Sequence, residues 1–434
     1  MAQLKQVFGV SKDPILSYVQ REHVDEALQD AISGTRQIVI YGSSKQGKSA
    51  LLDQHIPHQD RVTVHCGPAS SIGDIYRALL RQQDVEVVTE TQTKADTGVK
   101  LGAIAKFKAK LPWIGGAELG PSGEILRARS DTETRSTIEF NLEAAQDVAE
   151  LLLKLPRKFC VLENFHYLSP EVQSQLAFDI RTFEEMGIRF IILGVWREGN
   201  RLAQYCGDLQ DRVAEVPVEP WVEDDFFKVI HAGEVHLNVR FSEDISRGII
   251  SKAHGSIGVA QELLQKTCAQ HGINQRPKEL FEVDRVECLE AAVSSKIAEY
   301  SARHIRSLES IAVGQRTMTA TEGKAALFLP YYFILVIINS DYNELKDGIE
   351  RAALLSKIKA IHPLSENVRN SDITAMLQRL GALQEKANIS PPLFDYDRGT
   401  RRVKVIDSTL YFFVDNCDPK DVESELPRPN EGDA

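Results

Sequence analysis

Residues 37–52, QIVIYGSSKQGKSALL, limit most strongly what this chain can fold into. The stretch begins with a short β-branched and apolar run, residues 37–41, which is typical of a fully buried strand. Residues 42–49 then spell GSSKQGKS, the complete pattern of a phosphate-binding loop (P-loop), and the following residues open a helix. A strand, a glycine loop and a helix in this order turn backbone N–H groups toward phosphate oxygens. The sequence therefore predicts a site for a nucleoside triphosphate.

The P-loop contributes most of the nucleotide-binding residues that we expect: Gly42, Ser43, Ser44, Lys45, Gln46, Gly47, Lys48 and Ser49. Lys48 should reach the β- and γ-phosphates of ATP and act as a catalytic residue. The Ser49 hydroxyl should ligate Mg²⁺. A chance match in a turn is the alternative, and the flanking strand and helix argue against it.

Composition fits a large protein of the cytoplasm. A chain of 434 residues holds two to four structural units, and its 43% hydrophobic content can build a large core. The net charge of −11 argues against a protein that coats nucleic acid. Six scattered cysteines without a C-x-x-C pair indicate reduced thiols. We expect neither a signal peptide nor a membrane span, because the longest apolar stretch is too short and contains Pro330.

Apolar strand patterns begin near residues 37, 61, 159, 188 and 213 and alternate with helical patterns. This alternation predicts an α/β fold, a doubly wound and mostly parallel P-loop NTPase sheet with its ligand at the carboxyl ends of the strands. The expected units are an ATPase core (1–221), a helical lid (222–275), a helical connector (276–345), a winged helix (346–415) and a disordered acidic tail (416–434). The winged helix is predicted from two helices followed by a hairpin that alternates over residues 393–414.

An insertion in the core, at about residues 90–135, is rich in Gly, Thr and Lys. Residues 106–111 (KFKAKL) alternate strictly, which predicts a β-hairpin or flexible insertion closed by a turn at 112–116. Contact with DNA, a partner or a neighbouring subunit is one interpretation. A solvated edge hairpin protected by its lysines is the other.

An acidic residue, Glu163, ends the apolar strand pattern over residues 159–162, which is the Walker B position. There a carboxylate holds the waters of Mg²⁺, so Ser49 and Glu163 form the predicted metal site. The next residue is Asn164, whose amide cannot accept a proton at neutral pH. Slow hydrolysis is therefore expected, and His166 is either a substitute base or an ordinary core or surface histidine. Arg21 and Glu22, ahead of the first strand, either border the base or begin a solvated helix.

The order of these motifs resembles that of AAA+ and STAND ATPases, nearest to bacterial members akin to transposition-regulator and origin-recognition ATPases. The resemblance covers about residues 18–264 and includes GSSKQGKS, VLENFHYL, GVWRE, DLQDRV and GSIG. It departs from the family at Asn164, in a lid helix without the arginine of sensor 2, and in GSIG, where the STAND proline is replaced.

The resemblance implies roles for further residues. Glu163 would hold the Mg²⁺-bound water, and Arg197 would occupy the sensor-1 position near the γ-phosphate. Arg212 would be an arginine finger that reaches the nucleotide of a neighbouring subunit, with a surface arginine paired with Asp208 or Asp211 as the alternative. Gly255 and Ser256 would lie at the nucleotide-sensing end of the lid.

Two functions follow as hypotheses. The first is an ATPase that hydrolyses slowly, forms homo-oligomers and signals as a switch to a protein partner, a type that the resemblance links to phage defence or control of mobile elements. The second is a DNA-binding initiator, loader or transposition regulator that docks on duplex through its winged helix. Residues 369–404 hold seven basic and four acidic side chains, a balance of 7 − 4 = +3. Gln378 and Arg379 are the expected base readers there.

Overall fold

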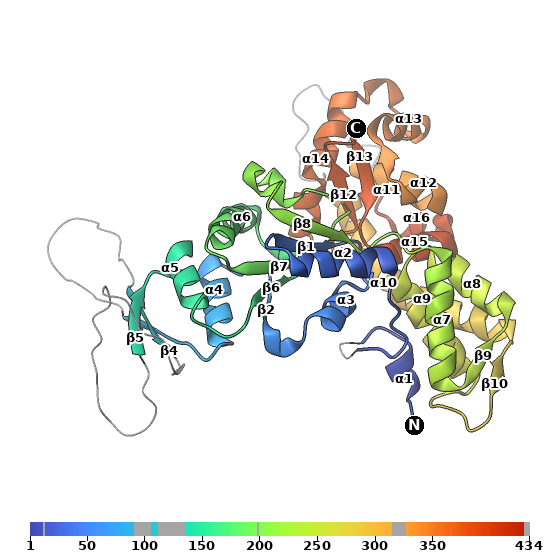
Figure 1. Ribbon diagram of the computed structural model, residues 1–434. Coiled ribbons are helices and arrows are strands. Elements are labelled where there is room, and N and C mark those ends of the chain that lie inside the picture. The colour runs from blue at the N-terminus through green and yellow to red at the C-terminus, as the bar shows by residue number, and fades with distance from the viewer. Residues whose placement is uncertain (12–13, 91–105, 112–135, 198, 315–326, 429–434) are drawn as a thin grey trace.

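The central element of the computed structural model is a five-stranded parallel sheet (Figure 1). The structure describes residues 1–11, 14–90, 106–111, 136–197, 199–314 and 327–428. The strands of the sheet are β1 (Gln37–Tyr41), β2 (Arg61–His65), β6 (Phe159–Glu163), β7 (Arg189–Gly194) and β8 (Val213–Pro217). They lie in the order β2-β6-β7-β1-β8, and every neighbouring pair is parallel. The predicted doubly wound α/β sheet is confirmed.

Helices cover both faces of this sheet because its strands are apolar on both sides. The helices are α2 (Glu22–Ser33) and α3 (Lys48–His55) on one face, and α4 (Ile72–Arg81), α5 (Ala145–Leu152) and α6 (Pro170–Glu185) on the other. Alternate residues of β1 separate the two cores: Ile38 and Ile40 pack with α2 and α3, while Val39 packs with α4 to α6.

A small antiparallel sheet extends one end of the molecule, away from the lid (Figure 1). It contains β4 (Lys106–Leu111) between β3 (Glu86–Glu90) and β5 (Ser136–Phe140). The strand expected over 106–111 is therefore present, while the turn at 112–116 and most of the predicted insertion lie outside the described residues. In the turn before α5, the Asn141 side chain accepts from Glu143 N–H at 3.0 Å.

A helical lid follows β8. It consists of α7 (Glu223–Leu237), α8 (Glu243–Ala253) and α9 (Ile257–Gln270), with the short parallel strands β9 (Val239–Phe241) and β10 (Phe281–Val283). The N-terminal helix α1 (Leu4–Val7) packs in the same core. Ser242 and Ser256 begin α8 and α9 by accepting a backbone N–H three residues on, as N-cap serines do.

A 28-residue helix, α10 (Val286–Val313), joins the lid to the C-terminal elements. These elements are α11 (Leu329–Ile338), α12 (Tyr342–Lys346), β11 (Ile349–Glu350), α13 (Arg351–Ile361), α14 (Asn370–Lys386), β12 (Phe394–Asp397), β13 (Arg402–Val405) and α15 (Ser408–Asn416). The hairpin expected over 393–414 ends at Val405. The remaining part is helical because its apolar run is buried on all sides and Asp407 accepts from Thr409 N–H at 3.1 Å.

The expectation of a disordered tail from residue 416 is wrong where the structure describes it. Residues 419–425 form α16 (Pro419–Glu425), which Asp418 caps and Pro419 begins. Val422 of α16 and Leu426, the residue that follows the helix, are buried in the C-terminal core. These two apolar side chains dock the segment on that core, although its composition is acidic.

Two further properties concern the described residues only. No helix in this part of the chain combines the length and the apolar character needed to cross a bilayer. All six cysteines are free thiols, and five of them are buried.

Candidate nucleotide-binding site

The P-loop leaves the sheet at the point where the strand order reverses. From β1 the chain runs out to the edge strand β2, returns through β6 and β7, and crosses to β8 on the other side of β1. In open α/β sheets, ligands bind outside the carboxyl ends of the strands at such a reversal. The loop of residues 42–47 and the first turn of α3 occupy this position.

Two glycines allow the loop its path. A Cβ on Gly42 would lie 2.6 Å from Cγ2 of Val218, which follows β8, so only glycine fits between the two segments. Gly47 has a φ of +84°, in the left-handed region that glycine adopts without a Cβ penalty. Directly after it, α3 begins at Lys48.

Lys48 folds onto the inside of the loop. Its ammonium donates to the carbonyl oxygens of Gly42 at 3.0 Å and Ser43 at 2.6 Å. Burial lowers the pKa of Lys48 from 10.5 to about 8, while the charge of Glu219 acts in the opposite direction. Ser49, next along the helix, is exposed.

A residue that the sequence analysis missed lies against the loop. Glu219 follows β8, and its carboxylate accepts from Ser43 N–H at 2.5 Å and from the Gln46 side chain at 3.1 Å. The signal available in the sequence was its position, because Glu219 comes just after the strand that pairs with β1.

The lid packs directly on the P-loop through the GSIG segment. Gln46 donates to the carbonyl of Gly255 at 3.3 Å, and Gly258 N–H donates to the carbonyl of Lys45 at 3.0 Å. The Lys45 ammonium lies 3.0 Å from a carboxylate oxygen of Glu262 in α9. Ser256, the cap of α9, is fully buried beside these contacts. The structure thus brings Gly255 and Ser256 next to the P-loop.

The side chains of Arg21 and Glu22 point to different parts of the molecule. The Arg21 guanidinium lies 3.8 Å from the ring centre of Trp221, and it donates to Val218 O at 2.7 Å. Trp221 in turn donates to the carbonyl of Gln46 at 3.4 Å, so Arg21 is tied to the P-loop through this indole.

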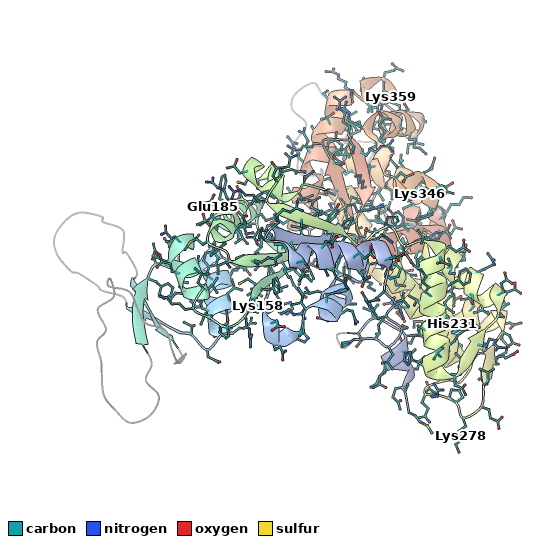
Figure 2. The ribbon with its side chains drawn as sticks, viewed as in Figure 1. Lys158, Glu185, His231, Lys278, Lys346 and Lys359 are labelled. Atoms are coloured by element: carbon teal, nitrogen blue, oxygen red, sulfur yellow. The ribbon has the colours of Figure 1, made fainter. Side chains whose placement is uncertain are left out.

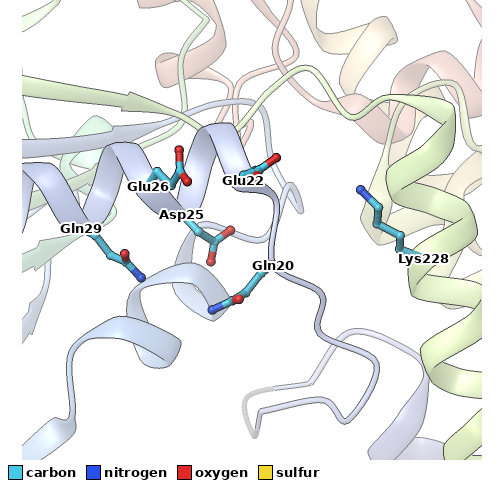
Figure 3. A pocket seen from close by; sticks show the side chains of 6 residues that line it. All are labelled: Gln20, Glu22, Asp25, Glu26, Gln29 and Lys228. Atoms are coloured by element: carbon cyan, nitrogen blue, oxygen red, sulfur yellow. The ribbon is translucent and has the colours of Figure 1, made fainter.

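Glu22 instead lines a polar surface hollow between α2 and α7, shown in Figure 3. The side chains around it are Gln20, Glu22, Asp25, Glu26, Gln29 and Lys228. Three of these six carry carboxylates, so the hollow is unsuited to a phosphate, and none of the six belongs to the P-loop.

The Walker B strand β6 ends with Glu163, as predicted. Its carboxylate lies 3.0 Å from His65 Nδ1 of the neighbouring β2. Asn164 follows with a φ of +60°, a left-handed conformation in which asparagine is enriched. The backbone therefore gives a structural reason for asparagine at this position.

His166 is unsuited to act as a base. Its Nδ1 accepts from Val195 N–H at 3.4 Å, which places the proton of the neutral ring on Nε2. Burial, with Lys48 and Arg201 as further causes, lowers the pKa of His166 to about 3. The ring is therefore neutral at pH 7 and presents a donor.

Arg197 lies beyond the end of β7 and reaches the C-terminal elements. It donates to the carbonyl of Lys346 at 2.9 Å and to the Tyr411 hydroxyl at 2.8 Å. Lys346 is labelled in Figure 2. In this structure Arg197 therefore ties the core to the C-terminal unit.

Arg212 lies at the amino end of β8, the opposite edge of the sheet from the P-loop. It forms ion pairs with Glu184 and Glu185 of α6, the second at 3.3 Å, and neither Asp208 nor Asp211 is its ion-pair partner. Figure 2 shows Glu185 on the flank away from Lys346. Arg212 is thus outside the P-loop site of its own chain.

The features at this edge define the fold of a P-loop NTPase: a parallel sheet, a P-loop at its reversal point, a half-buried lysine and a carboxylate at the end of β6. Ser49 and Glu163 both lie at the carboxyl edge of the sheet, and their oxygens are the donors that Mg²⁺ prefers. The residues present therefore fit ATP with Mg²⁺. Among the described residues, no group of three or more His, Cys, Asp or Glu side chains could hold a metal on its own.

Comparison with known proteins gives structural similarity alone. No protein-family model matches the sequence, and no curated protein matches it either. The chain is similar to a Walker-type ATPase of Pyrococcus abyssi, with 12% identity, 93% of this chain and 99% of that chain covered, and a TM-score of 0.48.

The chain is also similar to Orc1 of Aeropyrum pernix, solved in complex with DNA (11% identity, 94% and 93% covered, TM-score 0.38). A third similar structure is the RuvB Holliday junction branch migration motor of Thermotoga maritima (11% identity, 96% and 100% covered, TM-score 0.38). These neighbours are P-loop ATPases, and Orc1 and RuvB are of the AAA+ type. Because all three TM-scores are below 0.5, what this chain binds is inferred from its own residues.

Proposed function

We propose that this chain binds ATP with Mg²⁺ at the P-loop and hydrolyses it slowly, as a switch that assembles with further copies and signals to a protein partner. The observation that carries the proposal is the loop itself: Lys48 is half-buried and donates to two loop carbonyls at the end of β1. Phosphoryl transfer needs mainly positioning and charge neutralisation, which Lys48 and a Mg²⁺ held by Ser49 and Glu163 would supply.

A switch needs a path from the nucleotide to the rest of the chain. Lys45 connects the P-loop to the lid and to α10, because its ammonium contacts Glu262 and lies 3.2 Å from the Tyr300 hydroxyl. Arg197 connects the core to the C-terminal unit. The setting that we propose, phage defence or control of mobile elements, follows from the sequence resemblance.

The test is ATP binding by calorimetry in the presence of Mg²⁺. Lys48→Ala should abolish or greatly weaken binding, because the β- and γ-phosphates lose their cation. Lys158→Ala is the matched control, since Lys158 is an exposed lysine at the amino end of β6 (Figure 2). Unchanged affinity in Lys48→Ala would refute the nucleotide-site assignment.

A second candidate, DNA binding by the C-terminal unit, is favoured by the exposure of its basic side chains. The succession of α13, α14, β12 and β13 supports the winged helix that we propose for this unit. Arg398 and Arg401 are exposed at the β12–β13 turn, and Gln378 and Arg379 are exposed on α14. Arg402 is engaged within the fold, where it donates to Gly348 O at 2.7 Å.

The DNA test therefore changes Arg398 and Arg401 and spares Arg402. The double change to alanine should weaken duplex binding and reduce the salt slope by about 0.9 for each lost phosphate contact. Removing two exposed charges from the lid, Lys228→Ala with Arg247→Ala, should leave the slope unchanged. A wild-type protein without salt-sensitive DNA affinity would favour a partner-docking role for the unit.

A further inference from the structure

Two N–H groups of the P-loop already have acceptors within the chain. Ser43 N–H donates to the Glu219 carboxylate at 2.5 Å, and Ser44 N–H donates to the carbonyl of Ile406 at 3.2 Å. In a P-loop, backbone N–H groups of this kind cradle phosphate oxygens. The chain thus supplies its own acceptors for two N–H groups of this loop.

Glu219 resembles a phosphate in charge and in acceptor pattern. Its two oxygens accept from two different donors of the loop, Ser43 N–H and the Gln46 side chain. A carboxylate also carries the negative charge that the Lys48 site requires, and the charge of Glu219 acts to raise the pKa of Lys48 against burial. Hydrogen bonds to an ionised acceptor are about twice as strong as neutral ones.

The second acceptor comes from the C-terminal unit, in the segment that joins β13 to α15. Besides the Ile406 carbonyl, the Ser408 hydroxyl donates to Ser44 O at 2.9 Å. Ser408 also lies 2.9 Å from the hydroxyl of Ser256, the cap of lid helix α9. Asp407, which lies between Ile406 and Ser408 in the chain, is buried and forms an ion pair with Arg303 of α10. The P-loop, the lid and the C-terminal unit therefore meet at one point.

We propose that Glu219 is an internal competitor of the nucleotide phosphates, and that ATP must displace both this carboxylate and the segment of residues 406–408. Binding at the P-loop is then coupled to release of the C-terminal unit from the core. This inference rests on the proposed function, because it requires that the P-loop binds ATP. We call Glu219 together with residues 406–408 the latch, because these groups hold the C-terminal unit on the P-loop until ATP displaces them.

The first test removes the negative charge of Glu219 and keeps the shape of its side chain. Glu219→Gln should bind Mg²⁺–ATP about 10- to 100-fold more tightly than the wild type, because the displaced hydrogen bond is no longer ionic. The affinity is measured at pH 7.0, where Lys48 remains mostly protonated. Glu215→Gln is the matched control: Glu215 lies four residues earlier in β8 and accepts from Asn200 N–H, away from the P-loop.

The second test concerns the C-terminal half of the latch. Ser408→Ala removes the hydroxyl that links Ser44 and Ser256, and it should tighten ATP binding about threefold. In the wild type, ATP should raise hydrogen exchange of α15, whose start lies against the P-loop, while Lys48→Ala should show no such change. Should Glu219→Gln fail to fold, the Ser408→Ala affinity and the exchange of α15 still decide the question.

The outcomes separate the latch from the nucleotide site. If the wild type binds ATP and all three variants (Glu219→Gln, Ser408→Ala and Glu215→Gln) bind it with the same affinity, the latch is overturned and the proposed function still stands. Tighter ATP binding in Glu219→Gln and Ser408→Ala, but not in Glu215→Gln, supports the latch. Absence of ATP binding in the wild type and in every variant would overturn the proposed function, and the latch with it.

Discussion

ATP binding should depend on pH through Lys48. The perturbation is a rise in pH from 7.5 to 9.5, and the group that responds is the buried ammonium, whose pKa is lowered from 10.5 to about 8 by burial. Phosphates beside this group raise its pKa, so binding favours the protonated form. Affinity is therefore retained below pH 8 and is lost as pH rises through that value.

The size of the effect follows from the two pKa values. With a pKa of about 8, the protonated fraction of Lys48 falls about 25-fold between pH 7.5 and 9.5, and affinity should fall by the same factor. With the ordinary value of 10.5, the protonated fraction would remain above about 90% over this range. The prediction thus separates a buried P-loop lysine from a solvated one.

The assay is calorimetry of Mg²⁺–ATP binding in buffers of different ionisation enthalpy. At pH 8.5 about three quarters of a proton should be taken up for each ATP bound, because that fraction of Lys48 is deprotonated beforehand. Lys48→Arg should bind more weakly with a flat profile, since a guanidinium stays charged. A flat wild-type profile without proton uptake would refute the reasoning.

Three further predictions concern residues around the site. Asn164→Asp should raise the steady-state hydrolysis rate at least about tenfold, because it adds a carboxylate base in a backbone conformation that aspartate tolerates. Arg212→Ala should leave ATP binding by the monomer intact but reduce hydrolysis and ATP-dependent assembly, and mixing it with Lys48→Ala should restore part of the activity. Gly258→Ala should lower the free energy of unfolding by about 1–3 kcal/mol in urea denaturation, because its Cβ would lie 2.8 Å from Lys45 O.

Each of these predictions has a control in a comparable position. Asn164→Gln changes the side chain without adding a charge, and an equal gain in rate would exclude base catalysis. Arg181→Ala, which also removes an ion pair with Glu185 of α6, should assemble normally. Normal assembly of Arg212→Ala would show that Arg212 is a surface residue without a role in the neighbouring site. Gly381→Ala, with no atom within 4 Å of the added Cβ, should not destabilise the protein.

The sequence predicted the parts of the site that are local. Strand β1, the P-loop and α3 are adjacent in the chain, and the glycines at 42 and 47 occupy the positions where the backbone requires them. The parallel sheet was equally accessible, because each of its strands is an apolar run followed by a helical pattern. Its register and order came from the structure.

The parts that the sequence could not predict are long-range or depend on burial. Glu219 meets Ser43 across 176 residues, and Ser408 meets Ser44 across 364. The sequence carries no signal for the Ser408 contact, and for Glu219 the signal is limited to its position just after β8. The apolar run that ends at Val414 fits a strand as well as a fully buried helix, and packing on all sides decides for α15.

The proposed slow hydrolysis and the proposed displacement of Glu219 are consistent with the same function. The residue after Glu163 is an amide, and His166 is held neutral with a pKa of about 3, so neither is a competent base at neutral pH. A nucleotide that entered such a site would persist as ATP. If its entry displaces Glu219 and the segment of residues 406–408, the released C-terminal unit stays released for as long as the γ-phosphate remains. A fast base would shorten that interval, so the residue types around Glu163 favour a timed switch over a motor.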